Sequence, residues 1–180
     1  MNKLSLFPKS PDKLIRKAVP KDLDEIMDIV WRTIMLLQSE GNMQWSETYP
    51  SRSDFVQDIS EETLYVCMVD KAVVGFICCN QTAPSEYSSV VWSVPAAPAL
   101  ILHRFAVSTE LHRRGIGTAL LQKAVDVAKG MGCHSIRTDT CSLNLRMRAL
   151  FTNNGYKKAG EVYFRGVPNA FYCYEKVLEQ

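Results

Sequence analysis

Residues 102–128 constrain the fold most, because a strand, a basic turn with two glycines and a helix follow one another there without a break. Residues 100–107 are apolar and rich in β-forming side chains, which predicts a buried strand. Apolar side chains then recur at helical spacing, at Ile116, Leu120, Leu121, Ala124, Val125 and Ala128. This spacing predicts a helix with one face in the core.

The turn at residues 112–118 has the physical features of a phosphate-binding site. The first N–H groups of a helix have no partner within the helix, and they lie at the positive end of its dipole. Gly115 and Gly117 carry no Cβ, so an anion can approach the backbone closely. Arg113 and Arg114 add guanidinium groups that suit phosphate oxygens. The alternative is a basic turn that only caps a structural helix.

Two common phosphate motifs do not fit this turn. A P-loop requires a lysine before the hydroxyl residue, and Thr118 has none before it. A dinucleotide-binding fingerprint requires a third small residue where Leu120 stands. The turn resembles instead the pyrophosphate loop of the GNAT superfamily of N-acetyltransferases, which reads Gln or Arg, two variable residues, Gly, one variable residue, and Gly or Ala. The six corresponding residues here are His112, Arg113, Arg114, Gly115, Ile116 and Gly117, and His112 departs from the pattern.

Composition limits the classes of function. A chain of 180 residues, 47% of them hydrophobic, is expected to form one globular domain. The net charge of +2 does not by itself imply a nucleic-acid partner. No apolar run has the length of a membrane span and no signal peptide opens the sequence, so we expect a cytoplasmic protein without a membrane partner.

The cysteines and histidines do not indicate a metal site. The six cysteines form no Cys-x-x-Cys pair, and most stand in apolar runs, which favours buried, reduced thiols. The three histidines lack the spacing to these cysteines that metal ligands show, so no metal is expected.

The predicted elements alternate between strands and helices. Residues 1–13 are read as a flexible lead-in. An Asp22–Glu25 capping box is expected to start a helix that ends at Gly41, and Ser53 is expected to cap a second helix over 53–59. A third helix is the one that begins at Ile116, and a fourth spans 145–153. Strands are predicted at 14–19, 64–69, 73–79, 100–107, 134–140, 156–164 and 170–177, with a short edge strand at 89–94.

This order, β-α-α-β-β-β-α-β-α-β-β, predicts an α+β fold with a mixed sheet of about six to seven strands and helices on both faces. The order agrees with the GNAT resemblance over residues 14–177, which implies a single acetyltransferase domain over 14–180. In that family the two central parallel strands diverge to admit the acyl donor.

The resemblance implies transfer of an acetyl group from acetyl-CoA to an amine. Residues 112–118 would hold the pyrophosphate, and Phe105, Ala106 and Val107 would offer backbone groups to the pantetheine arm and the thioester oxygen. Asn144 would also reach the pantetheine. Seven residues later the family often has a tyrosine that protonates the leaving thiolate. This chain has Phe151, which cannot donate a proton and is expected to line the pocket.

His103 is the candidate general base, because histidine titrates near neutral pH and arylalkylamine acetyltransferases have a histidine at the matching place. The alternative is a half-buried structural histidine. Tyr163, Tyr172 and Glu161 are further candidates. Trp45 and Tyr49 lie in a loop where the family's acceptor pocket usually forms, so they either contact the acceptor or pack on the sheet.

Two other functions fit parts of the sequence. A helix-turn-helix DNA-binding protein would use 113–123 as its recognition helix, but the strand before it and the low net charge argue against this. A GNAT-like domain that binds acyl-CoA without catalysis, as a sensor or partner module, is favoured by Phe151. A homodimer formed through the closing strands is also considered. The sequence does not identify the amine.

Overall fold

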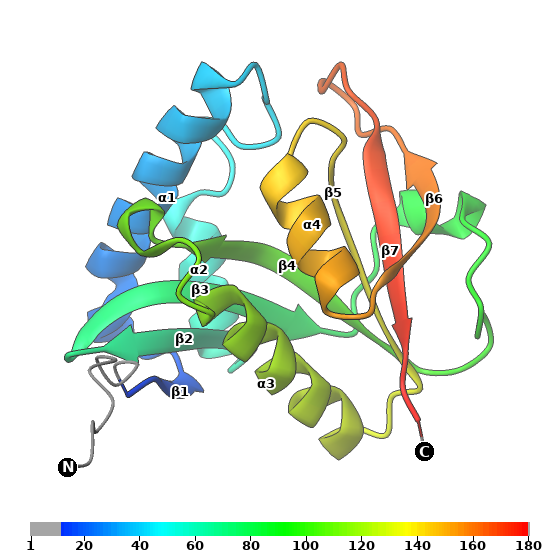
Figure 1. Ribbon diagram of the computed structural model, residues 1–180, viewed down its shortest axis with the longest axis horizontal. Helices are drawn as coiled ribbons and strands as arrows, with labels where there is room; N and C mark the ends of the chain where they lie inside the picture. Colours follow the sequence, from blue (N-terminus) through cyan, green and yellow to red (C-terminus); the bar gives the residue numbers. More distant parts are fainter. Residues whose placement is uncertain (1–11, 180) are drawn as a thin grey trace, which may run out of the picture.

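Seven strands form one mixed sheet in the computed structural model, which describes residues 12–179 (Figure 1). The order across the sheet is β1-β2-β3-β4-β5-β7-β6. The strands are β1 (Leu14–Lys17), β2 (Leu64–Val69), β3 (Ala72–Asn80), β4 (Ala99–Val107), β5 (Ser135–Cys141), β6 (Lys157–Val162) and β7 (Phe171–Val177). The helices are α1 (Leu23–Ser39), α2 (Arg52–Ser60), α3 (Ile116–Gly130) and α4 (Leu145–Asn153). The predicted fold class and element order are confirmed, whereas the lead-in at 1–13 lies almost wholly outside the described residues.

A parallel pair of strands lies at the centre of the sheet, between two antiparallel parts. β4 and β5 are parallel, and the other neighbouring strands are antiparallel. The predicted hairpin between β2 and β3 is confirmed. Its two turn residues, Asp70 and Lys71, both have positive φ (49° and 70°), as the tightest hairpin turns require. β7 lies between β5 and β6, so the C-terminal pair of strands, β6 and β7, joins the rest of the sheet through β7.

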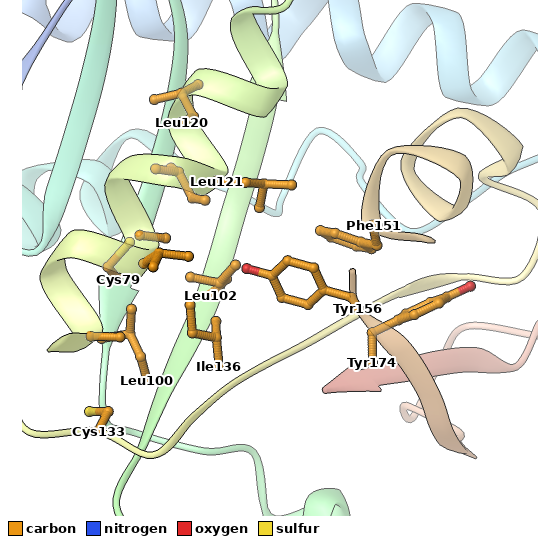
Figure 2. Packing of buried hydrophobic residues seen from close by; sticks show 14 of the residues in the cluster. Cys79, Leu100, Leu102, Leu120, Leu121, Cys133, Ile136, Phe151, Tyr156 and Tyr174 are labelled. Atoms are coloured by element: carbon orange, nitrogen blue, oxygen red, sulfur yellow. The ribbon is translucent and has the colours of Figure 1, made fainter. Parts of the chain in front are cut away.

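Helices cover both faces of the sheet, and β3 shows how the alternation of side chains builds the two layers. Phe76 and Cys78 pack in the core beneath α1, whereas Ile77 and Cys79 pack beneath α3. Figure 2 shows the α3 side, where Leu120 and Leu121 of α3 belong to the same buried cluster as Leu100 and Leu102 of β4. All six cysteines are buried and free of disulfides, as predicted. In residues 12–179 no helix is long and apolar enough to cross a membrane.

The predicted capping box at the start of α1 is wrong. The Asp22 side chain caps no N–H group of α1; its Oδ2 accepts the Val19 N–H at 2.9 Å, and both its oxygens pair with Arg16 at 2.6 and 2.8 Å. Glu25 reaches across to β3, where Oε2 accepts the Val73 N–H at 2.7 Å. These carboxylates make tertiary contacts that local spacing does not reveal.

The predicted cap of α2 is displaced by two residues. α2 begins at Arg52, and Ser51 rather than Ser53 is its N-cap. The Ser51 Oγ accepts the Asp54 N–H at 3.3 Å, and Asp54 Oδ2 accepts the Ser51 N–H at 2.6 Å. The acidic residue three positions after Ser51 therefore selects it over Ser53.

The predicted edge strand at 89–94 is also wrong. A short 3-10 helix, Ser85–Ser89, precedes an irregular segment there. The Trp92 indole is buried and donates to Tyr87 O at 3.1 Å, while the Ser93 N–H donates to Glu175 Oε2 at 2.6 Å. The segment thus satisfies its polar groups by folding onto β5 and β7, and it adds no strand.

Candidate active site

The sheet opens between its two parallel strands. β4 and β5 pair only where Ala99–Ile101 face Ser135–Arg137. Beyond that point β4 carries a bulge, because Cys78 faces His103 and Phe76 faces Ala106, so three steps on β4 match two on β3. Arg104 lies within the bulge with φ of 39°. The divergence of β4 from β5 therefore follows from the backbone conformation of β4.

A large groove, about 710 Å³, lies along this opening between α1, α3 and α4. Phe105, Ala106 and Val107 line it from the end of β4. The turn before α3 lines it through His112, Arg113, Gly115, Ile116, Gly117 and Thr118. Arg114 is exposed and does not line it. Most of the residues predicted to hold acetyl-CoA thus share one groove.

Unpaired backbone donors point from the first turn of α3. Gly115, in the left-handed region with φ of 71°, is the N-cap. Ala119 is the first residue to donate into the helix, to Gly115 O at 3.1 Å. In the described part of the chain, no protein acceptor bonds to the N–H groups of Ile116, Gly117 or Thr118. Within residues 12–179 the turn therefore presents free donors of the kind that bind anions at helix N-termini.

Glycine and lysine shape the surroundings of this turn. A Cβ at Gly117 would lie 2.8 Å from the Leu150 Cδ2 atom, so the missing side chain lets α3 and α4 approach closely. A Cβ at Gly115 would lie 3.3 Å from the Nζ of Lys13. Lys13 thus brings a third positive charge, besides Arg113 and Arg114, from the chain just before β1.

Asn144 and Phe151 lie in different environments on α4. Asn144 is buried at the N-cap and accepts the Met147 N–H at 3.2 Å, and it lines the large groove. Phe151 is 1% exposed and packs against Phe105 and Tyr156, with ring centroids 6.3 and 5.5 Å away (Figure 2). Phe151 borders the second cavity described below rather than the large groove.

This inner cavity, about 290 Å³, lies on the other side of a shared wall. Gln44, Trp45, Phe105 and Met147 line both hollows, so they separate them. The inner cavity is also lined by His103, Arg104, Thr138, Asp139, Thr140, Tyr49, Phe164, Val167 and Phe171, among others. The two hollows are therefore adjacent.

His103 is a partly buried, neutral imidazole. Its Nε2 lies 3.0 Å from Thr82 O, and because a carbonyl oxygen only accepts, Nε2 carries the proton. Nδ1 is left as the proton acceptor. Burial and the neighbouring Arg104 lower the pKa of His103, so its ring is neutral at physiological pH.

Arg104, the cation beside His103, is paired with Asp58. Its Nε and Nη2 atoms donate to the two carboxylate oxygens of Asp58, each at 2.6 Å. The two side chains are 14% and 4% exposed. Because the pair is bidentate and buried, Arg104 offers little free charge to the cavity.

Asp139 is the carboxylate of the inner cavity. The Tyr87 hydroxyl donates to its Oδ2 at 2.8 Å. Burial, with a smaller contribution from Glu86, raises the pKa of Asp139 to about 6. In the described part of the chain, no lysine or arginine forms an ion pair with Asp139. The cavity therefore holds an anion without a counter-ion near neutral pH.

The loop between α1 and α2 closes the inner cavity. Trp45 is 5% exposed and stacks on Phe76, with centroids 6.4 Å apart. Tyr49 is 44% exposed. Gln44 Oε1 accepts the Cys141 N–H at 3.0 Å and the Thr140 hydroxyl at 3.2 Å, which ties the loop to β5. Both predicted acceptor-contacting residues thus line this cavity, and Trp45 also packs on the sheet.

Comparison with known proteins identifies the family. The model of the acetyltransferase (GNAT) family matches residues 24–156. The chain belongs to this family. An acetyltransferase of the GNAT family from Streptococcus agalactiae has a similar structure, with a TM-score of 0.82 and 25% identity, over 93% of this chain and 96% of that one. A PaiA N-acetyltransferase from Thermoplasma acidophilum, solved in complex with coenzyme A, has a TM-score of 0.70 at 18% identity, over 93% of this chain and 99% of that one.

Curated GNAT relatives have similarly low sequence identity. The uncharacterized N-acetyltransferase YesJ of Bacillus subtilis is 25% identical over 146 residues, which is 79% of this chain and 81% of YesJ. An uncharacterized N-acetyltransferase of Methanocaldococcus jannaschii is 24% identical over 120 residues, 66% of this chain. The match spans about half, 49%, of the length of that archaeal relative.

Some candidates in this GNAT domain do not reach the site, and others were missed. Tyr163, Tyr172 and Glu161 line neither hollow, and Lys158 lies over the Tyr172 ring, 3.4 Å from its centroid. Asp139, Gln44 and Lys13 were not predicted. Asp139 could have been predicted from the sequence, because an acidic residue inside an otherwise buried strand is unusual.

Proposed function

We propose that this GNAT domain is an enzyme that transfers the acetyl group of acetyl-CoA to a primary amine. One observation carries the proposal. The unpaired N–H groups of Ile116, Gly117 and Thr118 face a groove that shares a wall with a cavity containing His103 and Asp139. A site for an anionic donor thus adjoins a site for a cationic acceptor. The neighbour solved in complex with coenzyme A supports coenzyme A as the carrier of the acetyl group.

The turn before α3 fits the diphosphate of acetyl-CoA. Three unpaired amides, a cap residue without a Cβ and the guanidinium of Arg113 suit an anion that approaches the backbone. Residues 112–118 would hold the diphosphate, with Lys13 nearby as a further cation. The backbone of Phe105, Ala106 and Val107 would receive the pantetheine arm, together with Asn144, and a backbone N–H there would stabilise negative charge on the thioester oxygen.

His103 and Asp139 would prepare the amine. A primary amine arrives as an ammonium ion, whose charge the Asp139 carboxylate attracts. Nδ1 of His103 accepts one proton from the ammonium, which leaves the nitrogen lone pair free to attack. Acetyl-CoA supplies an activated thioester carbonyl. The nitrogen forms a C–N bond to the carbonyl carbon as the C–S bond breaks, and the sulfur leaves with that electron pair.

Proton balance explains why Phe151 is compatible with catalysis. The attacking nitrogen loses a second proton, which goes to solvent, and His103 later returns its own proton to solvent. The leaving thiolate needs no side-chain acid, because a thiol of pKa ~8.5 departs as thiolate and takes its proton from water. The products are the amide, the free thiol and one net proton.

Thiol release from acetyl-CoA tests this function. The purified protein is mixed with acetyl-CoA and a panel of primary amines, and free thiol is measured with a chromogenic thiol reagent. Calorimetry with coenzyme A alone measures donor binding separately. Donor binding with amine-dependent thiol release is the expected result. Donor binding without release for any amine would favour the non-catalytic acyl-CoA-binding domain that Phe151 allows, and absence of both would contradict the proposal.

A further inference from the structure

The charges in the inner cavity restrict the acceptor beyond its amine group. Among the described residues that line this cavity, Arg104 and Asp139 are the two with full charges. Arg104 donates from Nε and Nη2 to the two oxygens of Asp58, which balances its charge. Asp139 has a hydroxyl partner but no cation. The cavity therefore has one unmatched charge, and it is negative.

A carboxylate on the acceptor would meet no unbalanced positive charge among the described residues that line this cavity. An amino acid carries its carboxylate next to its ammonium group, so its binding would place a second anion near Asp139. Like charges brought together in a partly desolvated space are repelled and also lose hydration. Arg104 keeps its Nη1 hydrogens for such a carboxylate, but Asp58, which is 4% exposed, already balances its charge, so the added carboxylate would give the cavity a further net negative charge. A second ammonium group, as in a polyamine, would likewise find no second carboxylate among the described lining residues.

The remaining wall combines aromatic and apolar side chains with the polar groups of Gln44, Thr138 and Thr140. Phe164 and Phe171 meet edge to face, with centroids 4.8 Å apart, and Trp45 and Phe105 form the side toward the large groove. A volume of about 290 Å³ lies near the lower end of the range of roughly 300–1,000 Å³ for small-molecule pockets. The space suits one apolar group about the size of a single ring.

We propose that the acceptor is a small monoamine with an apolar or aromatic body and no carboxylate, whose ammonium group is bound by Asp139. This inference rests on the proposed function and narrows its substrate class. Three features carry it: the unpaired carboxylate, the arginine already neutralised by Asp58, and the aromatic wall.

Matched pairs of acceptors test the class. Phenethylamine and phenylalanine differ by one carboxylate, as do isoamylamine and leucine, while butylamine and putrescine differ by a second amine. Because like-charge contacts are costly, kcat/KM should be at least about tenfold higher for the first member of each pair. Equal or better use of phenylalanine, leucine or putrescine would overturn this inference and leave acetyl transfer itself intact.

A variant of Asp139 tests the anchor. Asp139→Asn keeps an acceptor oxygen for Tyr87 but removes the charge, so the fold is expected to persist. The KM for phenethylamine should rise about tenfold or more, with little change in the KM for acetyl-CoA. Asp126→Asn, the same change on the exposed face of α3, is the control and should alter neither.

Binding without turnover separates this inference from the proposed function. Phenethylamine is titrated by calorimetry into the protein saturated with coenzyme A, for the wild type and for Asp139→Asn. Binding that depends on Asp139 supports the anchor even if no thiol is released, in which case the proposed function alone fails. Binding that is equal in both proteins would contradict the anchor.

Discussion

At the scale of single residues, burial acts in opposite directions on two titratable groups of the inner cavity, His103 and Asp139. It lowers the pKa of His103, whose charged form is the cation, and raises the pKa of Asp139 to about 6, because its charged form is the anion. Above about pH 7 His103 is therefore neutral and Asp139 is ionised. One residue is ready to accept a proton while the other still attracts an ammonium ion.

Replacement of His103 tests its role as base. The wild-type kcat is expected to rise with pH through a pKa below 6.5 and then level off, since only neutral His103 accepts a proton. His103→Ala should lower kcat by about 10²- to 10⁴-fold and remove that limb of the profile. His134→Ala, at a histidine outside both hollows, is the control. An unchanged pH–rate profile in His103→Ala would exclude His103 as the base.

The buried pair of Arg104 and Asp58 is expected to matter for stability. Asp58→Asn leaves the Arg104 charge buried without its partner, which should lower the free energy of unfolding by about 3–5 kcal/mol. Chemical denaturation measures the change. Glu62→Gln, which breaks the exposed pair with Lys17, is the matched control and should have little effect. Equal, small changes in both variants would show that the Arg104–Asp58 pair adds no more than a surface pair.

Sequence reasoning at this scale found His103 but missed Asp139. A histidine near the end of a recognisable strand stands out by residue type alone. Asp139 becomes distinctive only through Tyr87, 52 positions earlier in the chain, and through the absence of a nearby cation. Such an environment is created by tertiary packing, and local sequence does not encode it.

At the scale of elements, the junction of β4 and α3 was the most predictable part of the site. Its strand, turn and helix follow from hydrophobic spacing and two glycines, and all three are present. The β4 bulge at Arg104 was not predictable, because bulges depend on register against β3. The predicted caps of α1 and α2 were wrong for a related reason. Several acidic and hydroxyl residues satisfy the local spacing rule for a helix cap, and tertiary contacts select among them.

The two adjacent arginines of this turn are expected to differ. Arg113 lines the large groove and Arg114 does not. Arg113→Ala should raise the Kd for coenzyme A about tenfold, as for the loss of a charge-assisted hydrogen bond to phosphate. Arg114→Ala, the same change one residue away, should raise it less than about twofold. Calorimetry measures the Kd for coenzyme A in both variants. A larger effect of Arg114→Ala than of Arg113→Ala would contradict the assignment of the diphosphate to the large groove.

At the scale of the whole molecule, the divergence of β4 and β5 separates the sheet into two parts that side chains reconnect. Gln44 joins the α1–α2 loop to β5, and Arg146 on α4 forms a bidentate pair with Glu40 at the end of α1, at 2.7 and 2.6 Å. Figure 1 shows α1 and α4 on opposite sides of this opening. Both bridges span the region where the large groove and the inner cavity meet, so the shape of the site depends on contacts between distant segments.

Removal of the Gln44 bridge should therefore alter acceptor binding more than chemistry. In Gln44→Ala the Cys141 N–H loses its acceptor, which should lower the free energy of unfolding by about 1–3 kcal/mol. The loop that carries Trp45 and Tyr49 also loses its tie to β5, so the KM for the amine should rise several-fold, about 2- to 10-fold, while kcat changes less. Hydrogen exchange of residues 42–50 should be faster than in the wild type. Gln122→Ala, on the exposed surface of α3, is the control and should change none of these. A fall in kcat at constant KM would instead show that Gln44 acts on the reacting groups rather than on the loop.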